Sequence, residues 1–226
     1  MTLPKAMLFD MDGTLIDSEH YWQTAEVRLF ASLGEEWLPE YSDQLAGNSL
    51  TDSIEIMRRA TGVDLDTDQT VKYLIDSVHD QLIEGGVPWL PGALETLLLA
   101  KTLGIKTALV TSSYRKFTQA VIDRAPAGIF DVTVCGDEVK YAKPHPFPYL
   151  QAAKLLGVDP VDCMAFEDSV SGTRAALDSG ALTVVTPGVN PPAFDQRAIY
   201  LSDLTVVNHS WLKDSWHKSG RATTKI

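Results

Sequence analysis

Two aspartates separated by a single residue, Asp10 and Asp12, directly follow a short apolar run near the start of the sequence. One carboxylate of such a pair can attack phosphorus and form an aspartyl-phosphate, and the other can protonate the leaving oxygen and later activate water. Gly13 permits a tight turn immediately after the pair. Aspartate and glycine are also ordinary turn residues, so a simple turn is the alternative explanation for this segment taken alone.

Three more apolar runs end in side chains that suit phosphate chemistry. The hydroxyls of Thr111 and Ser112 can bind phosphate oxygens together with helix N-terminal amides, or they can cap the helix that follows. Lys143 can neutralise a phosphate, and its alternative is a solvated surface charge. Glu167 and Asp168 offer the oxygen ligands that Mg²⁺ prefers, or they complement a helix dipole. Each signal has a structural alternative, and their combination favours a catalytic site.

The apolar runs are short and do not alternate with polar residues, which is typical of strands buried on both faces of a parallel sheet. Helical patterns lie between them, so the sequence predicts a doubly wound, Rossmann-like α/β fold. In such sheets ligands bind beyond the carboxyl ends of the strands, where the polar side chains described above stand. The five predicted strands are Ala6–Phe9, Thr107–Val110, Val132–Cys135, Cys163–Phe166 and Leu182–Val185.

Between about residues 17 and 87 the apolar positions keep a helical period and no strand run occurs. We expect an all-helical cap inserted at 17–87, joined by paired linkers that let it move as a lid. The α/β core then consists of 1–16 and 88–213, with helices near Leu94 and after Ser113, Pro146 and Ser171. The polar tail, 214–226, is predicted to be disordered.

Composition narrows the class of partner. The chain has 226 residues, which suffices for one domain with a small insert, and a formal net charge of −11. Because such a surface repels nucleic acid and anionic membranes, we expect neither as a partner, and no protein partner is implied. The sequence has neither a signal-peptide pattern nor an apolar run near the ~20 residues of a membrane helix, so a cytoplasmic location is expected. Cys135 and Cys163 lie in apolar runs and are predicted to be buried thiols.

Taken in order, the motifs resemble those of the haloacid dehalogenase superfamily of aspartate-nucleophile phosphatases. The matching segments are Asp10-Met11-Asp12-Gly13-Thr14, Thr111/Ser112, Lys143-Pro144 and Glu167-Asp168. The helical insert resembles the small cap of the subgroup that includes β-phosphoglucomutase, phosphoglycolate phosphatase and sugar-phosphate phosphatases. The resemblance implies a Mg²⁺-dependent phosphatase that hydrolyses a small phosphorylated metabolite through an aspartyl-phosphate.

The resemblance also implies a role for each motif residue. Asp10 would be the nucleophile and a metal ligand. Asp12 would be the general acid and base, with its backbone carbonyl on the metal. Thr111 and Ser112 would hold the phosphate, and Lys143 would balance charge between the phosphate and the nucleophile.

The acid pair at the last motif completes the implied magnesium site. Asp168 would ligate the metal, and Glu167 would do so either directly or through water. The metal and the lysine matter because a phosphate dianion must otherwise approach a carboxylate against charge repulsion. The metal would act as a template and a charge neutraliser.

The cap departs from the pattern of the mutases. Trp22 occupies the position of a histidine in the β-phosphoglucomutase-like pattern, and Ala46 and Leu50 occupy those of two basic residues. This departure argues against a mutase, which must hold a second phosphate. Asn48, Trp22 and Trp89 are possible substrate contacts, although core packing is the favoured explanation for both tryptophans.

Three other functions remain alternatives: a sugar-phosphate mutase of the same family, a dehalogenase, and a non-catalytic phosphate-binding module. A dehalogenase needs neither Asp12 nor the acid pair, and a binding module needs no general acid. The remaining basic residues of the cap are expected on solvent-exposed helix positions, and they are Arg28, Arg58, Arg59 and Lys72.

Overall fold

A computed structural model describes residues 3–45, 48–189 and 191–221. Its centre is a six-stranded parallel sheet in the order β3-β2-β1-β4-β5-β6. The strands are β1 (Ala6–Phe9), β2 (Lys106–Val110), β3 (Val132–Val134), β4 (Cys163–Glu167), β5 (Leu182–Val185) and β6 (Ala198–Tyr200). The sheet confirms the predicted α/β class, and all five predicted strands are present within one residue at each end.

The sixth strand, β6, was not predicted. It has only three residues and lies at the edge of the sheet, where its side chains are half-buried or exposed. Ala198-Ile199-Tyr200-Leu201 is an apolar run as short as those of the predicted strands, and it follows a polar stretch that contains two prolines.

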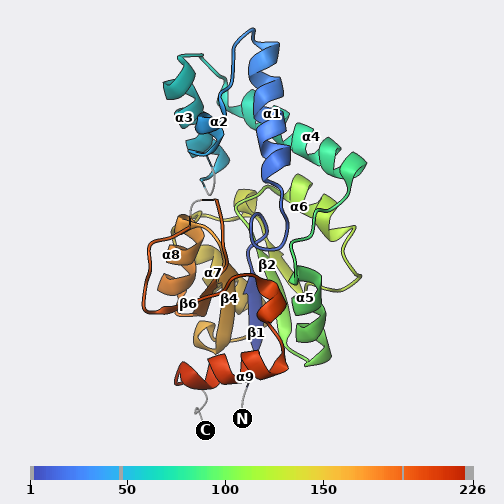
Figure 1. Ribbon diagram of the computed structural model, residues 1–226, viewed down its shortest axis with the longest axis vertical. Helices are drawn as coiled ribbons and strands as arrows, with labels where there is room; N and C mark the ends of the chain where they lie inside the picture. Colours follow the sequence, from blue (N-terminus) through green and yellow to red (C-terminus); the bar gives the residue numbers. More distant parts are fainter. Residues whose placement is uncertain (1–2, 46–47, 190, 222–226) are drawn as a thin grey trace.

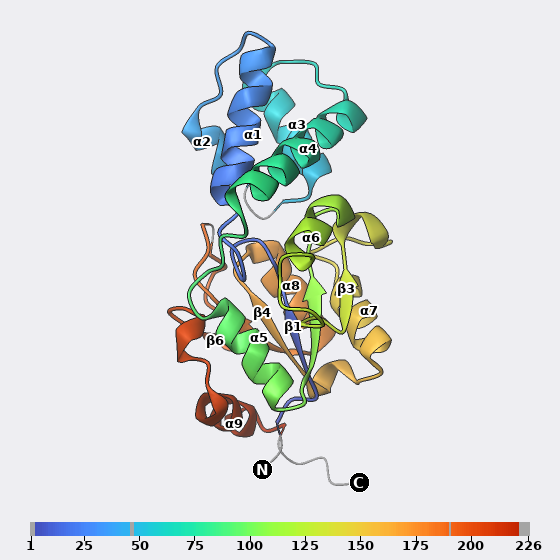
Figure 2. The ribbon, with the colours of Figure 1, turned by 90° about the vertical axis from the view of Figure 1, so that its right-hand side faces the viewer.

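Helices cover both faces of the sheet (Figure 2). Met7 and Phe9 of β1 belong to the core cluster that includes Leu97, Phe117 and Trp216, from α5 (Ala93–Thr102), α6 (Arg115–Ile122) and α9 (His209–Lys218). The alternate residues of β1 pack on the opposite face against α7 (Phe147–Leu156) and α8 (Val170–Ser179). Burial on both faces explains why the strands read as continuous apolar runs.

Four helices lie between β1 and α5, at the carboxyl ends of the central strands (Figure 1). They are α1 (Glu19–Ser32), α2 (Pro39–Ser42), α3 (Leu50–Thr61) and α4 (Thr67–Gly85). We call residues 17–87 the helical insert. The two linkers that join it to the sheet run side by side, because the N–H of Asp17 donates to Pro88 O at 2.8 Å and that of Leu90 to Leu15 O at 2.9 Å. Independent behaviour of the insert as a domain stays a prediction.

The C-terminal segment corrects one expectation. Helix α9 continues through Lys218, into the stretch predicted to be disordered from residue 214. Trp216 is only 2% exposed and belongs to the core cluster, so its burial orders the polar residues around it. Residues 222–226 lie outside the described part of the chain.

Two further observations concern the remaining expectations. Cys135 and Cys163 are both buried free thiols, as predicted. Within the described residues, no helix is both long enough and apolar enough to cross a membrane.

Candidate active site

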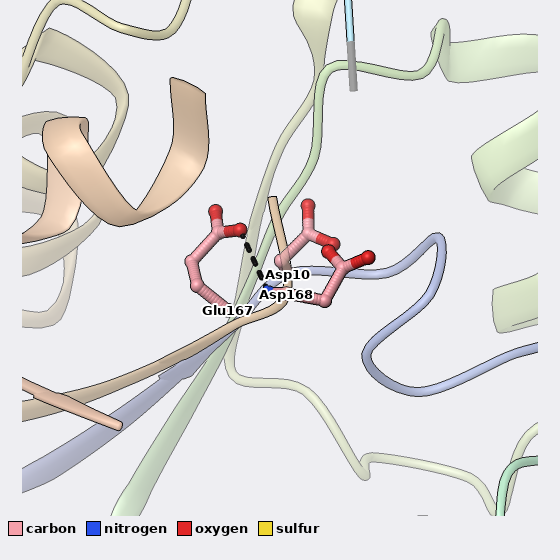
Figure 3. Close-up of side chains that lie close together, drawn as sticks. All are labelled: Asp10, Glu167 and Asp168. Atoms are coloured by element: carbon pink, nitrogen blue, oxygen red, sulfur yellow. Dashed lines mark hydrogen bonds between the residues drawn. The ribbon is translucent and has the colours of Figure 1, made fainter. Parts of the chain in front are cut away.

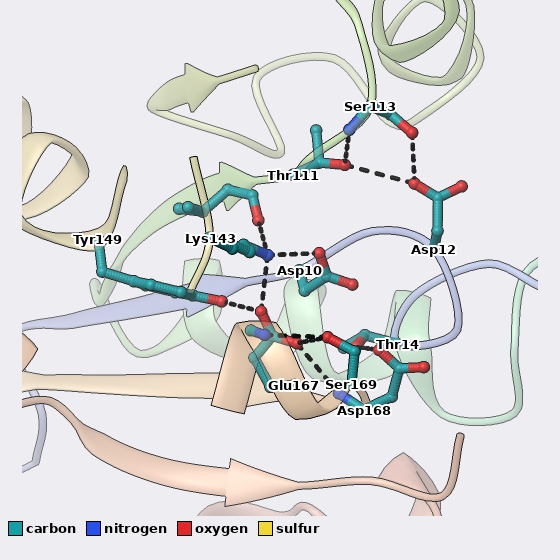
Figure 4. A network of polar contacts seen from close by, with 12 residues as sticks. Asp10, Asp12, Thr14, Thr111, Ser113, Lys143, Tyr149, Glu167, Asp168 and Ser169 are labelled. Carbon is teal, nitrogen blue, oxygen red and sulfur yellow. Dashed lines mark hydrogen bonds and ion pairs between the residues drawn. The ribbon is translucent and has the colours of Figure 1, made fainter. Parts of the chain in front are cut away.

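The motif residues meet at the carboxyl ends of three neighbouring strands. Phe9 at the end of β1 lies opposite Leu109 on β2 and Phe166 on β4. The residues that follow these strand ends therefore share one edge of the sheet, as the parallel arrangement requires. Figure 4 shows the resulting polar network, which joins residues more than 130 positions apart in the sequence.

Lys143 is the centre of this network. Its Nζ lies 2.7 Å from Asp10 Oδ1 and 2.6 Å from Glu167 Oε1, and it donates to the carbonyl of Val110 at 2.9 Å. The side chain is 3% exposed, which rules out the solvated surface charge considered from the sequence. Burial lowers the pKa of Lys143, but the charges of Asp10 and Glu167 outweigh burial and raise it, so the ammonium stays charged.

Glu167 is held by hydrogen-bond donors on both oxygens. Oε1 accepts from the Tyr149 hydroxyl at 2.5 Å as well as from Lys143. Oε2 accepts from the N–H of Asp168 at 3.2 Å and from Ser169 Oγ at 3.3 Å. The side chain is 0% exposed, and these donors hold its carboxyl group in place beneath the site.

Asp10, Glu167 and Asp168 each present a carboxylate oxygen within 4.8 Å of the others (Figure 3). Burial, together with the charges of Glu167 and Asp12, raises the pKa of Asp10 to about 7 against the opposing effect of Lys143. Burial also raises the pKa of Asp168, with the charges of Asp10 and Glu167 adding to the shift. A divalent cation bound among these hard oxygen donors would offset the repulsion between the neighbouring carboxylates. The set therefore fits Mg²⁺.

Two glycines make room for Asp168. A Cβ on Gly13 would lie 2.1 Å from Asp168 Oδ2, and one on Gly188 would lie 2.5 Å from the same oxygen. Gly13 also adopts a φ of 82°, which few other residues tolerate. The glycine after the aspartate pair is therefore required by the turn and by close approach to the carboxylate cluster.

Asp12 accepts hydrogen bonds from both sides of the site. Ser113 Oγ at 2.7 Å and Thr111 Oγ1 at 3.3 Å bond to Oδ2. Ser18 Oγ at 2.5 Å and Trp22 Nε1 at 3.4 Å bond to Oδ1 from the helical insert. These donors orient the carboxylate and link its position to that of the insert.

Three of these contacts were not predicted. Ser113 directly follows the predicted pair Thr111 and Ser112, but spacing alone does not show which hydroxyl reaches Asp12. Ser18 was assigned to a linker, and Tyr149 had no signal at all because an aromatic side chain on a buried helix face usually packs in the core. Thr14, part of the first motif, donates to Asp168 Oδ1 at 3.4 Å.

Thr111 and Ser112 both line the open space beside the carboxylate cluster. Thr111 Oγ1 also accepts a hydrogen bond from the N–H of Ser113 at 2.9 Å, so this hydroxyl stabilises the turn as well as facing the site. A Cβ on Gly136 would lie 2.0 Å from Ser112 O, so this glycine lets the loop come close. Phosphate binding by the two hydroxyls stays a prediction.

The open space is a cavity of about 440 Å³ between the strand ends and the helical insert. Among its lining residues in the described part of the chain, Lys143 is the only lysine or arginine. The insert contributes acidic, hydroxyl, amide and apolar side chains, namely Asp17, Ser18, Glu19, Trp22, Glu26, Ser42, Leu45, Asn48, Leu50, Ser53, Met57 and Leu74.

The structure places the residues that were considered as substrate contacts in different surroundings. Trp22 lines the cavity and contacts Asp12, so core packing does not fully describe it. Trp89 packs against the core, as favoured. Asn48 lines the cavity, but its amide donates to Gln44 O at 2.8 Å. Leu50 lines the cavity, and Ala46 falls outside the described residues.

The basic residues of the insert do not line the cavity. Arg28, Arg59 and Lys72 are exposed, as predicted. Arg58 is half-buried, contrary to the expectation, because its guanidinium bonds to Leu65 O and Thr67 Oγ1.

Comparisons with known proteins agree with this geometry. Residues 4–180 match the family model of haloacid dehalogenase-like hydrolases. "Hexitol phosphatase B" of Escherichia coli (strain K12) is 34% identical over 213 residues, covering 88% of this chain and 92% of that protein. "Protein CbbY" of Rhodobacter capsulatus is 34% identical over 198 residues, covering 81% of this chain and 85% of that protein.

Solved structures give the same result. CbbY from Rhodobacter sphaeroides in complex with phosphate superimposes with a TM-score of 0.85 at 28% identity, over 94% of this chain and all of that one. β-Phosphoglucomutase from Clostridium difficile has a TM-score of 0.81 over 95% of this chain and 97% of that one; at 20% identity it supports the fold alone. The family model spans more than half of the chain and the relatives exceed 30% identity over most of it, so the chain belongs to the haloacid dehalogenase-like hydrolases.

Proposed function

We propose that this phosphoric monoester hydrolase is a Mg²⁺-dependent phosphatase that hydrolyses small sugar or polyol phosphates through an aspartyl-phosphate on Asp10. The observation that carries the proposal is the buried Lys143–Asp10 ion pair at 2.7 Å, beside a second carboxylate that is held by hydroxyl donors. A cation next to the nucleophile lets an anionic phosphate approach a carboxylate.

In the first step, a carboxylate oxygen of Asp10 attacks phosphorus and the bond from phosphorus to the leaving oxygen breaks. Asp12 gives its proton to that oxygen, so the product leaves as an alcohol. In the second step Asp12 takes a proton from water, whose oxygen attacks the phosphorus of the aspartyl-phosphate. Inorganic phosphate leaves, and the Asp10 carboxylate is restored. The donors from Ser113 and Ser18 support this role by fixing the orientation of Asp12.

We assign the cation to Asp10, Asp168 and the backbone carbonyl of Asp12. When bound there, Mg²⁺ would neutralise phosphate charge and hold the phosphate in line for attack. Both oxygens of Glu167 already accept hydrogen bonds from protein donors, which favours its action through water over direct ligation. Thr111 and Ser112 line the cavity on the side opposite Asp168's strand and are assigned to the phosphate oxygens.

The substrate class follows from the cavity and from the relatives. One relative is named a hexitol phosphatase, and a CbbY structure contains xylulose-(1,5)bisphosphate. In the described part of this chain, however, the cavity offers Lys143 as its only lysine or arginine, and that ammonium is paired with Asp10 and Glu167. A second phosphate would lack a charged partner, so a phosphatase for monoesters is favoured over a mutase.

Phosphorus NMR tests the proposal. Purified protein should release inorganic phosphate from hexitol 6-phosphates with Mg²⁺, stop in excess EDTA, and resume when Mg²⁺ is restored. With β-glucose 1-phosphate and trace glucose 1,6-bisphosphate, free phosphate should form without interconversion to glucose 6-phosphate. Full activity in EDTA would contradict the assignment of the cation. Formation of glucose 6-phosphate faster than free phosphate would establish a mutase instead.

A further inference from the structure

Helix α1 carries a buried carboxylate that the proposed reaction does not use. Glu26 is 5% exposed and lines the same cavity as Asp10 and Asp12. Its Oε2 accepts hydrogen bonds from Trp37 Nε1 at 3.1 Å and from the Ser42 hydroxyl. Because a buried carboxylate is costly, its presence on a cavity wall requires an explanation beyond packing.

The second oxygen of Glu26 is available. Within the described part of the chain, no hydrogen bond reaches Oε1. The described side-chain atoms that are both enclosed and unpartnered are the hydroxyls of Thr118 and Thr173, so Oε1 is not sealed inside the protein. Glu26 is 5% exposed and lines the cavity, so a ligand in the cavity can reach this side chain.

The position of Glu26 along α1 places it away from the phosphate end of the cavity. Ser18, Trp22 and Glu26 are spaced four residues apart and all line the cavity. Ser18 and Trp22 both bond to Asp12, at 2.5 and 3.4 Å. Since four residues of helix advance about 6 Å, Glu26 stands roughly one turn beyond the contact with the general acid.

The surroundings of Glu26 favour a neutral hydroxyl as its partner. Burial raises its pKa to about 7, with hydrogen bonds from Ser42 and Trp37 opposing the shift and Glu19 adding to it. Both protonation states are then populated near neutral pH, and a hydroxyl can donate to one and accept from the other. A distal phosphate or carboxylate would meet a like charge.

We propose that Glu26 is a specificity-determining residue whose Oε1 hydrogen-bonds the terminal hydroxyl of a phosphorylated polyol, at the end of the substrate distal to the phosphate. The inference rests on the proposed phosphatase function. In this proposal one side chain of the helical insert recognises both the length of the substrate and its neutral end. This side chain is separate from the residues that react.

The test compares variants and substrates in pairs. Glu26→Met keeps the volume of the side chain and removes the hydrogen bond. Trp37 Nε1 also donates to Ser42 Oγ at 2.8 Å, so these two groups keep a partner in the variant. Glu26→Gln restores a polar group, and Glu36→Met is the matched control at an exposed position of the same insert. Steady-state kinetics are measured with sorbitol 6-phosphate, its 1-deoxy analogue and glycerol 3-phosphate.

The expected loss is confined to the long substrate. Glu26→Met should raise KM for sorbitol 6-phosphate by about 10- to 100-fold, leave kcat within about twofold, and leave glycerol 3-phosphate unaffected. Glu26→Gln should recover part of the loss, and Glu36→Met should match wild type. Wild type should disfavour the 1-deoxy analogue by a similar factor, a comparison that does not depend on the folding of any variant.

Each contrary result has its own meaning. Wild-type protein that releases phosphate normally but does not distinguish sorbitol 6-phosphate from its 1-deoxy analogue overturns the role of Glu26 and leaves the phosphatase standing. An equal loss for the long and short substrates shows a structural role and overturns it too, as does a preference for a 1-amino analogue over the hydroxyl. Wild-type protein that hydrolyses none of the three contradicts the proposed function itself.

Discussion

Two buried carboxylates face the cavity of this molecule with opposite neighbours. Asp10, at the end of β1, pairs with the ammonium of Lys143 at 2.7 Å. Glu26, on α1, is held by neutral donors from Trp37 and Ser42. Burial raises the pKa of both to about 7, although the cation beside Asp10 opposes the shift and two other carboxylates increase it.

The two ends of the cavity differ in the groups that line them. At the strand ends, charges of both signs are packed together, which suits a phosphate and a cation. On the insert, the wall holds acidic, hydroxyl and apolar groups, which suits a neutral polyol chain. Under the proposed function, the reacting groups would stay fixed on the sheet while the insert selects the remainder of the substrate.

The largest effect should come from the nucleophile. Asp10→Asn keeps the shape of the side chain but removes the charge that attacks phosphorus. We expect phosphate release to fall by at least about 1,000-fold with the fold intact by circular dichroism. Near wild-type turnover in this variant would place the chemistry elsewhere.

Substitutions of Asp168 and Glu167 should weaken Mg²⁺ binding to different extents. Asp168→Ala should weaken activation by Mg²⁺ more than about 100-fold, because it removes an assigned ligand. Glu167→Gln should weaken it about 10-fold, as expected for a group that acts through water and through Lys143. Titration of activity against Mg²⁺ measures both, and equal effects would place Glu167 directly on the metal.

Glu26 should make stability depend on pH. Its folded-state pKa of about 7 lies above the ordinary value of 4.5, so the folded protein retains a proton that the unfolded chain has released between these values. The stabilisation is complete below pH 4.5 and is lost as the pH rises through 7. Relative to wild type, Glu26→Gln should gain roughly 2–3 kcal/mol in free energy of unfolding between pH 5 and pH 8.

Urea denaturation at both pH values measures this change. Glu36→Gln, at an exposed position of the insert, is the control and should follow wild type at each pH. A difference between wild type and Glu26→Gln that does not vary with pH would show that Glu26 is ionised in the folded protein throughout the range, and would remove the contrast with Asp10.

The smallest effect should distinguish two neighbouring hydroxyls. Ser113 Oγ donates to Asp12 at 2.7 Å, whereas Ser112 lines the cavity and is assigned to the phosphate. Ser113→Ala should lower kcat about 10-fold and shift the pH dependence of kcat, and Ser112→Ala should mainly raise KM. Identical changes in both variants would show that the loop acts as one unit.

The sequence predicted the sheet and the strand-end residues because both have short-range signals. Apolar runs buried on both faces need no distant partner to be recognised, and Asp10, Lys143 and Asp168 each stand beside such a run or a helix start. Edge strand β6 and helix α9 were missed because their signals are short: one apolar run of four residues, Ala198–Leu201, and one pair of apolar residues at helical spacing, Leu212 and Trp216, each among polar residues.

The contacts that orient the side chains of the site could not be predicted from the sequence. Tyr149, Ser18 and Glu26 have hydrogen-bond partners 6 to 18 positions away, and each belongs to a residue type with a common structural role. Only the three-dimensional arrangement shows that the Ser18 hydroxyl reaches Asp12 and that Glu26 on α1 lines the cavity.

Detection of an aspartyl-phosphate on Asp10 tests the proposed mechanism. Asp12→Asn should still be phosphorylated by p-nitrophenyl phosphate, because that leaving group needs little protonation, but should lack the base that activates water. Acid quenching followed by peptide mass spectrometry should then find phosphate on Asp10 accumulating above the wild-type level, and none when Asp10→Asn is added. Turnover by wild type with no phosphorylated Asp10 in either protein, or phosphate that persists in the double variant, would contradict the central claim.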